Sequence, residues 1–245
     1  MKIALFSDIH GNISGLKAVL QAIDKGGADM LIAAGDMLGG GPGTDDLMEL
    51  LQERQVKMVR GNAEEIWLDM DAAWGEMYKL WQRMDSERDF DLERKKWMDE
   101  MRPTVDCMHE RLSQPYWDLL ASLPLSLTLE IAPGHRLMVC HAAPDNPWPL
   151  CTGMKTPLKV LQETYGEVDA DVIAFGHIHR HHLRQLGSKL LLNISSVKGR
   201  EDVPGHSAFT WLNFIEGHWL VEQLLVPYDT VEEQRLIAER QVPPL

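Results

Sequence analysis

The chain has few cysteines, no long apolar runs and few basic residues, and each shortage excludes a class of protein. Its three cysteines, Cys107, Cys140 and Cys151, form no CxxC pair, so we expect free thiols in a reducing compartment. No apolar stretch approaches the length of a membrane span, and the run at residues 3–6 is too short for a signal-peptide core. We therefore expect a cytoplasmic protein without a membrane partner.

Positive charge is scarce as well. There are 24 Lys and Arg against 37 Asp and Glu, which gives a net charge of −13. Such a surface repels polyanions, so we expect no dedicated nucleic-acid surface. A bound phosphate compound would need positive charge from a local source. The 245 residues show no internal repeat or low-complexity segment, and we predict a single domain over 1–245.

Short apolar runs that end in polar residues recur in the first part of the chain. Strands are predicted at 2–7, 30–36 and 56–62, with helices at 13–23, where Asn12 can cap, and at 45–54. Strand, polar tip and helix in alternation predict βαβ units, whose ligand sites lie at the carboxyl ends of the strands. The chain is therefore of the α/β (α+β) class.

The later part of the chain is predicted to be more antiparallel. The expected strands lie at 126–131, 136–141, 171–177, 189–196, 207–214 and 218–228. Helices are expected at 156–166 and at 230–240, where Thr230 can cap.

Residues 63–121 form a predicted helical insertion that is highly charged and rich in Met and Trp. Trp67, Trp74 and Trp81 recur every seven residues, which predicts one helix face that serves packing. Pro103 and Pro115 are expected to break or start helices. The insertion follows Asn62 directly and must begin beside a strand end. It could form a lid or the dimer surface of a homo-oligomer.

Seven metal-capable residues fall at the predicted strand ends. They are Asp8, His10, Asp36, Asn62, His141, His177 and His179. This oxygen and nitrogen set without a thiolate suits Mn, Fe, Zn or Ni rather than a structural zinc. Seven ligands are too many for one ion with an open position, but they suit two divalent ions that share a carboxylate. Asp36 comes alone at its strand end, where it could bridge the two ions. We expect Mn²⁺ to serve in vitro.

These residues lie in five short motifs: "DIHGN", "GDMLGGGP", "RGN", "VCHAAP" and "GHIH". In this order the motifs resemble those of the calcineurin-like metallophosphoesterases, most closely the compact bacterial and archaeal phosphodiesterase branch. The resemblance reaches from the "DIHGN" near the amino terminus to the "VPYD" near the other end. It leaves only the helical insertion without a motif.

The resemblance implies a four-layer αββα sandwich and assigns the ligands to two ions. Ion one would be held by Asp8, His10, Asp36 and His179, and ion two by Asp36, Asn62, His141 and His177. A hydroxide that bridges the ions would be the nucleophile in the hydrolysis of a phosphoric ester. The predicted catalytic residues are His10, Asp36 and Asn62. His10 is a ligand that could also approach the leaving oxygen.

One departure from the family pattern affects the expected substrate. The third motif of the family usually reads GNH[DE], whereas this chain has Ala63 at the histidine position and Glu64 at the acidic one. One proton donor is therefore absent. Phosphodiesters, or esters with good leaving groups, depend less on such a donor, so we favour a phosphodiesterase. The substrate would be a small phosphate ester or a nucleotide.

Other functions stay open at this point. Diadenosine tetraphosphate hydrolysis and phosphomonoesterase activity are the alternatives within the same chemistry. The rival of another class is a scaffold that keeps the fold and docks partners without catalysis. All seven ligand positions are filled, which argues against the scaffold, and only Ala63 hints at decay.

Five side chains near the motifs receive no role in the predicted site. Arg60, Arg180 and Arg200 could meet phosphate oxygens, but an exposed arginine is usually solvated, and we assign none of them. His181 and His182 match no motif. We interpret both as surface residues or as residues that support the ligands.

Overall fold

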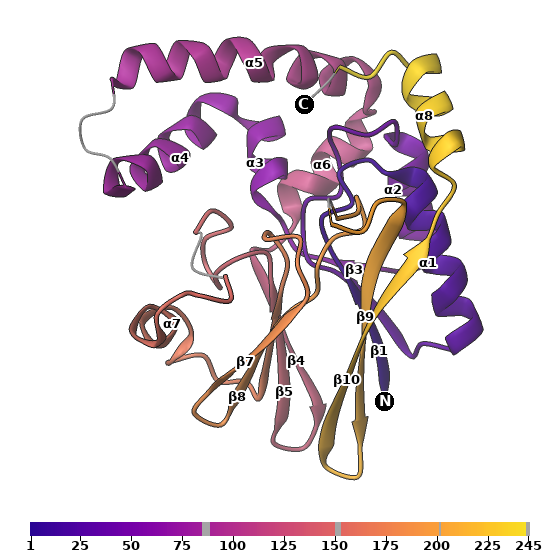
Figure 1. The fold of residues 1–245 in the computed structure, drawn as a ribbon, viewed down its shortest axis with the longest axis vertical. Helices are drawn as coiled ribbons and strands as arrows, with labels where there is room; N and C mark the ends of the chain where they lie inside the picture. The colour runs from indigo at the N-terminus through magenta and orange to yellow at the C-terminus, as the bar shows by residue number, and fades with distance from the viewer. Residues whose placement is uncertain (85–88, 150–152, 201, 244–245) are drawn as a thin grey trace.

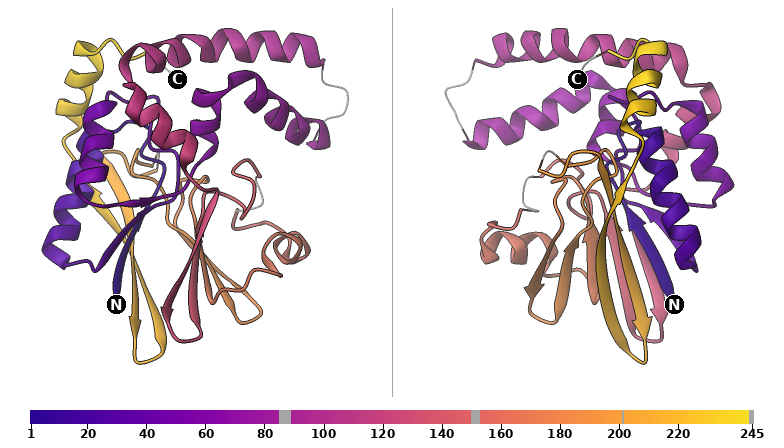
Figure 2. Two further views of the ribbon diagram at one scale, coloured as in Figure 1. Left: turned by 180° about the vertical axis from the view of Figure 1, so that it is seen from behind. Right: turned by 45° about the vertical axis from the view of Figure 1, so that its right-hand side comes forward.

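Two five-stranded sheets lie face to face, with helices on both outer sides (Figure 1). The computed structural model describes residues 1–84, 89–149, 153–200 and 202–243. Helices α1 and α2 cover one sheet and α7 covers the other, while further helices lie across the top of both (Figure 2). The predicted αββα sandwich is therefore confirmed.

The first sheet has the order β10-β9-β1-β2-β3. Its strands are β1 Lys2–Phe6, β2 Met30–Ala33, β3 Lys57–Met58, β9 His206–Ile215 and β10 His218–Pro227. Pairs β1–β2 and β2–β3 are parallel, as the predicted βαβ units require, with α1 Ile13–Gly26 and α2 Asp45–Glu53 as the crossovers. Strands β9 and β10 form an antiparallel hairpin that pairs with β1. Asn12 caps α1 as predicted, since its Oδ1 accepts the N–H of Gly15 at 2.7 Å.

The second sheet has the order β4-β5-β6-β8-β7. Its strands are β4 Ser126–Ala132, β5 His135–Cys140, β6 Val172–Phe175, β7 His182–Leu186 and β8 Lys189–Asn193. Pairs β5–β6 and β6–β8 are parallel and the two outer pairs are antiparallel. Strand β7 was not predicted, because only His182 and Leu186 of its five residues are buried and its pattern is polar.

The sandwich has three apolar layers, and alternate residues of a strand enter different ones. In β1, Ile3 and Leu5 face the second sheet, whereas Ala4 and Phe6 face the helices. On the far side of the second sheet, Cys140 is buried and packs with α7 Leu158–Tyr165. Cys107 is a free thiol, and Cys151 lies outside the described residues. Because the central strands are covered on both faces, they appear in the sequence as continuous apolar runs.

The predicted insertion is helical, but it is divided differently from the prediction. Its helices are α3 Asn62–Leu68, α4 Met70–Met84, α5 Phe90–Arg111 and α6 Gln114–Ser122. The three tryptophans do not share one helix, because Asp69 is extended and ends α3 between Trp67 and Trp74. Its Oδ1 accepts the N–H of Ala72 at 3.0 Å and starts α4.

The two prolines of the insertion behave differently. Pro115 lies in the first turn of α6, as predicted, whereas Pro103 lies inside α5 and the helix continues through it. Pro103 has no N–H, so the carbonyl of Asp99, four residues earlier, loses its helical donor. Both residues are exposed, and this carbonyl can bind water instead.

The last helix, α8 Thr230–Glu239, already includes Thr230, which was predicted to be its cap. Asp229 rather than Thr230 is the cap, and its Oδ1 accepts the N–H groups of Val231 and Glu232. A carboxylate at this position also complements the positive end of the helix dipole. Within the described ranges, no helix is both long enough and apolar enough to cross a membrane.

Candidate metal centre

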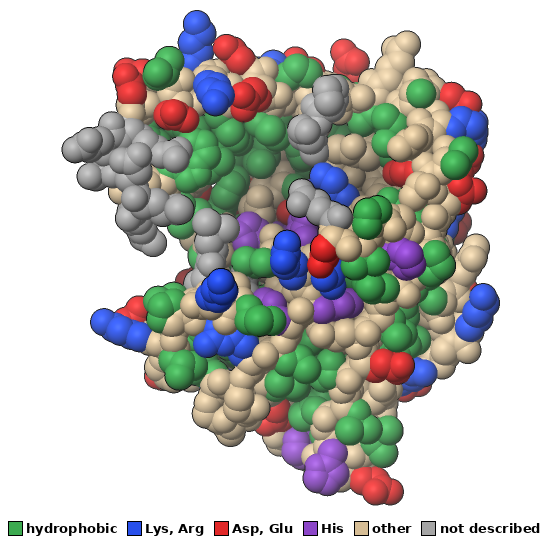
Figure 3. Space-filling model, viewed as in Figure 1, with side chains coloured by type: hydrophobic (Ala, Val, Ile, Leu, Met, Phe, Trp, Pro, Cys, Tyr) green, Lys and Arg blue, Asp and Glu red, His purple; other side chains and the backbone are tan. Residues whose placement is uncertain are grey.

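All seven predicted residues follow the carboxyl ends of strands, six of them in loops and Asn62 as the first residue of α3. Asp8 and His10 follow β1, Asp36 follows β2, Asn62 follows β3, His141 follows β5, and His177 and His179 follow β6. Strands β1 to β3 are parallel, as are β5 and β6, so each sheet brings its carboxyl ends to one edge. Figure 3 shows histidine side chains in a hollow between the upper helices and the sheets.

The backbone at the site is unusual for residues other than glycine. Left-handed φ values occur at Asp8 (51°), His10 (47°), Asp36 (55°), His177 (69°) and His179 (54°). Each such residue costs about 1–3 kcal/mol and persists only where its surroundings hold it. Here the N–H of Asp8 donates to Gly35 O at 3.0 Å, and that of His10 donates to Asp36 O at 2.9 Å. Strain concentrated in five candidate ligands is typical of a functional site.

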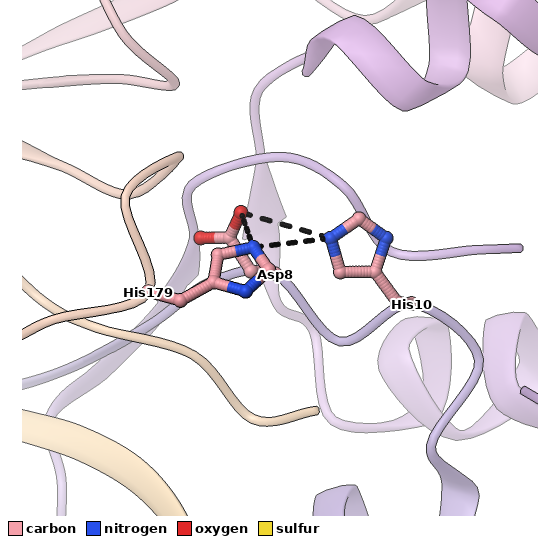
Figure 4. Close-up of side chains that lie close together, drawn as sticks. All are labelled: Asp8, His10 and His179. Atoms are coloured by element: carbon pink, nitrogen blue, oxygen red, sulfur yellow. Dashed lines mark hydrogen bonds and ion pairs between the residues drawn. The ribbon is translucent and has the colours of Figure 1, made fainter. Parts of the chain in front are cut away.

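The first group of side chains consists of Asp8, His10, Asp36 and His179 (Figure 4 shows all but Asp36). His179 Nε2 lies 3.1 Å from Asp8 Oδ1 and 3.3 Å from His10 Nε2. His10 Nε2 lies 3.5 Å from Asp36 Oδ2. The imidazoles of His10 and His179 are 13% and 34% exposed, so solvent reaches the site through this group.

The second group consists of Asp36, Asn62, His141 and His177. His141 Nε2 lies 2.9 Å from Asn62 Oδ1, 3.2 Å from His177 Nδ1 and 3.4 Å from Asp36 Oδ2. His177 Nδ1 lies 3.0 Å from Asn62 Oδ1. Asp36 Oδ2 therefore approaches an imidazole of each group, and the two groups meet at this carboxylate.

Burial and mutual charge determine the protonation of these groups. Burial is the main cause that lowers the pKa of His10 and of His177 to about 3. Burial opposes the ionisation of Asp8, but the hydrogen bond and charge of His179 hold its pKa below the usual range. For Asp36, burial is the main cause and raises the pKa to about 7. His10 and His177 are therefore neutral and offer lone pairs. At His141 and His179 burial is outweighed by the charge of Asp36 and Asp8, which raises the pKa of both imidazoles.

Backbone contacts orient His141 and Asp8. The Nδ1–H of His141 donates to Ala34 O at 2.8 Å, which leaves the lone pair of Nε2 directed at Asp36 and Asn62. The backbone N–H of His177 donates to Asp8 Oδ2 at 3.0 Å. The donor set of imidazole nitrogens, carboxylates and one amide oxygen fits divalent ions of the Mn, Fe, Zn and Ni kind.

Glu64 has a structural role that its sequence position did not reveal. Its carboxylate is fully buried and accepts the backbone N–H groups of Gly61, Asp36 and Met37 at 2.8–2.9 Å. The N–H of Ala63 donates to Asp36 Oδ1 at 2.8 Å. Glu64 thus joins the loop that carries Asp36 to the start of α3. The only sign of this role in the sequence was the presence of an acidic residue two positions after Asn62.

His181 and His182 lie outside both groups. His182 is buried in β7 with its ring centroid 6.0 Å from that of Phe175, so a surface role for it is wrong. His181 is partly exposed. Neither ring contributes an atom to the groups of metal-capable side chains found in the described part of the chain.

The chain is thus a two-sheet α/β sandwich whose histidine and carboxylate side chains gather at the carboxyl ends of the strands. Residues 1–211 match the model of the calcineurin-like phosphoesterase superfamily domain. This match covers most of the chain, and the protein belongs to that family. No curated protein matches the chain.

Solved structures share the fold over nearly the whole length. A hypothetical protein from Pyrococcus horikoshii is 17% identical with a TM-score of 0.77, covering 99% of this chain and 94% of its own. A metallophosphoesterase from Sphaerobacter thermophilus is also 17% identical, with a TM-score of 0.69 and coverage of 99% and 95%. At this identity the likeness demonstrates the fold, which includes the helical insertion because the coverage is nearly complete.

Proposed function

We propose that the protein is a dinuclear metal-dependent phosphoesterase that favours phosphodiesters. The observation that carries the proposal is the position of Asp36. Its Oδ2 lies 3.5 Å from His10 Nε2 in one group and 3.4 Å from His141 Nε2 in the other. One carboxylate between two sets of imidazole nitrogens suits a shared ligand of two cations.

The proposed ligands follow the two groups. Asp8, His10, Asp36 and His179 would hold one ion, and Asp36, Asn62, His141 and His177 the other. When bound, two divalent ions lower the pKa of a shared water and offset the charge of a phosphate ester. Glu64 holds the loop of Asp36, and Ala34 fixes the tautomer of His141, so the donors are oriented before any ion binds.

His10 is the catalytic residue that a substrate can reach from solvent. Burial holds its pKa at about 3, so His10 carries no proton to donate at neutral pH. Ala63 stands where the family pattern has a further histidine. With neither residue available as a proton donor, the site suits esters whose leaving group departs without protonation. This supports a preference for activated diesters over alkyl monoesters.

The test compares two activated substrates with Mn²⁺ as the metal. We expect kcat/KM for bis(p-nitrophenyl) phosphate to exceed that for p-nitrophenyl phosphate, and Asp36→Ala to abolish both activities. A strong preference for the monoester would overturn the diester proposal and would favour the phosphomonoesterase alternative. Diadenosine tetraphosphate belongs in the same panel as the third candidate substrate.

The scaffold alternative predicts a different result. A non-catalytic protein would bind less than about one ion per chain and would show no Mn²⁺-dependent hydrolysis. The five strained candidate ligands favour the enzyme, because a fold that only docks partners has no need to maintain that strain. The free thiol of Cys107 is in keeping with the cytoplasm, where we place the protein. A homo-oligomer stays a prediction.

A further inference from the structure

A cavity of about 740 Å³ opens beside His179, on the side where solvent reaches the site. Lys198, Gly199 and Arg200 line one part of it, and Tyr228 with Glu233 of α8 line another. A second cavity of about 300 Å³ shares His179 and Arg200 with the first and adds Arg180. Figure 3 shows Lys and Arg side chains next to histidines in this hollow. The volume of the first cavity lies in the range of sites that bind a nucleotide-sized ligand.

Lys198 is fixed to the metal centre through its backbone. Its N–H donates to Asp8 O at 2.9 Å, and its carbonyl accepts the side-chain N–H of Asn12 at 3.2 Å. The side chain is exposed, and its ammonium has no carboxylate within 4.0 Å among the residues that the structure describes. Lys198 is therefore a cation beside the site with no acidic partner in the described part of the chain, in a protein of net charge −13.

Arg200 is held in place rather than free. Its Nε and Nη2 donate to Asp202 Oδ1 and Oδ2 at 2.9 and 2.6 Å, a bidentate pair that fixes the guanidinium plane. The side chain is 18% exposed and contributes to both cavities. Because Asp202 offsets part of its charge, Arg200 attracts an anion less than Lys198 does.

Glu233, the acidic residue in the described lining of the large cavity, already accepts a hydrogen bond. Glu233 is 7% exposed, and its Oε2 accepts the N–H of Ser14 in the first turn of α1 at 3.0 Å. Burial is the main cause that raises its pKa. Because Glu233 is buried in the wall, the charge that the described lining residues expose to the cavity comes from Lys198 and Arg200, which favours an anionic ligand.

We propose that this cavity binds a second phosphate of the substrate, with Lys198 as the main specificity residue and Arg200 as the weaker one. The inference rests on the proposed phosphodiesterase function and gives its substrate class: a nucleotide-sized phosphodiester with an additional phosphate group. A diester without that group would leave the Lys198 ammonium without an anionic partner.

The test uses two substrates that differ only in the second phosphate. Thymidine 5′-(p-nitrophenyl phosphate) and its 3′-phosphorylated form share the same scissile diester and leaving group. With Mn²⁺, we expect the wild type to hydrolyse the 3′-phosphorylated form with a kcat/KM about tenfold higher or more. Lys198→Ala should reduce this ratio by about tenfold, Arg200→Gln should reduce it less, and Lys198→Arg should keep most of it.

Lys159→Ala is the matched control, because Lys159 is an exposed lysine on α7 outside both cavities. It should leave the ratio and both rates unchanged. A wild-type ratio near one, with both substrates hydrolysed, would overturn the inference while the proposed function stands. So would a high ratio that neither Lys198→Ala nor Arg200→Gln lowers.

A binding measurement separates the inference from the activity. Calorimetry should find that thymidine 3′,5′-bisphosphate binds about tenfold tighter than thymidine 5′-phosphate, and Lys198→Ala should remove the difference. If this difference is present but neither ester is hydrolysed, the proposed function fails and the cavity assignment stands. Equal binding of the two nucleotides would contradict the assignment whatever the activity.

Discussion

The buried carboxylate of Glu64 accepts a hydrogen bond of 2.9 Å from the backbone N–H of Asp36. It accepts two more, from Met37 and Gly61, both at 2.8 Å. One side chain thus satisfies three buried donors and connects the loop after β2 to the start of α3. The position of Asp36, on which both groups of candidate ligands converge, depends on this residue.

Glu64→Ala should therefore be strongly destabilising. It leaves three buried N–H groups without an acceptor, and we expect the free energy of unfolding to fall by about 3 kcal/mol or more. Urea denaturation of the chelator-treated protein measures this. Glu49→Ala on the exposed side of α2 is the control and should change stability by less than about 0.5 kcal/mol. A loss below about 1 kcal/mol for Glu64→Ala would mean that water replaces the carboxylate.

Ala63→His should shift the activity towards monoesters. Ala63 lies in the first turn of α3 beside Asp36, so an imidazole there could supply the proton that the leaving group now lacks. We expect the ratio of kcat/KM for p-nitrophenyl phosphate to that for bis(p-nitrophenyl) phosphate to rise about tenfold. Ala63 is only 4% exposed, so added bulk could itself change the activity. Ala63→Gln controls for this, because it adds bulk but no group that can act as an acid. Equal ratios in the two variants would assign any change to bulk alone.

Trp74 links α4 to α5, and its removal should loosen the helical insertion. Its ring lies 5.5–5.8 Å from those of Trp81, Trp97 and Phe90, and it is 1% exposed. Trp74→Ala should destabilise the protein by about 3–5 kcal/mol. Hydrogen exchange should increase in α4 and α5 before it does in β1 and β2. Uniform exchange across all elements would show that the insertion unfolds only with the sandwich.

The same variant tests whether the insertion is a lid. If α4 and α5 help to hold large substrates, Trp74→Ala should raise KM for a nucleotide diester while KM for bis(p-nitrophenyl) phosphate changes little. The ratio of the two kcat/KM values is the quantity to follow. An unchanged ratio would speak against a lid and leave the dimer-surface hypothesis, which the mass in solution can test.

Asp46 should contribute stability that disappears in acid. Burial opposes its ionisation, but the hydrogen bond of Arg240 and the N–H groups of Thr44 and Leu47 lower its pKa below the ordinary 3.8. A carboxyl group whose pKa is lower in the folded than in the unfolded protein stabilises the fold at pH values above its unfolded-state pKa. This stabilisation is lost as the pH falls through its folded-state pKa. Asp46→Asn should cost about 0.5 kcal/mol at neutral pH, because the pair is partly exposed and screened.

Urea unfolding of wild type and Asp46→Asn from about pH 7 to about pH 3 follows this difference. The two stabilities should converge at the acid end. A constant difference across the range would assign the effect of Asp46 to packing rather than to its charge.

The candidate site was predictable because its residues lie within short motifs at the ends of apolar runs. Asp8 and His10 follow β1 within four residues, and the parallel pairing of β1 with β2 is enough to bring Asp36 beside them. Local sequence therefore identified the residues, and the topology brought them together. The same runs predicted the βαβ units, whereas the four layers of the sandwich were implied by the family resemblance.

Features that depend on tertiary contacts were missed. Lys198 enters the hollow because the loop after β8 pairs with the backbone of Asp8, a contact across 190 positions that no local pattern encodes. Glu64 looked like part of a motif, and its three backbone donors come from two separate loops. The break at Asp69 left the seven-residue tryptophan spacing intact, so periodicity alone could not reveal it.

The most direct test of the central claim is the number of Mn²⁺ ions that the chelator-stripped protein binds, measured by equilibrium dialysis. Two groups of ligands that meet at Asp36 predict about two ions per chain for the wild type and fewer for Asp36→Ala. Wild-type binding of less than about one ion, or of two ions that Asp36→Ala retains with the same affinity, would contradict the dinuclear assignment.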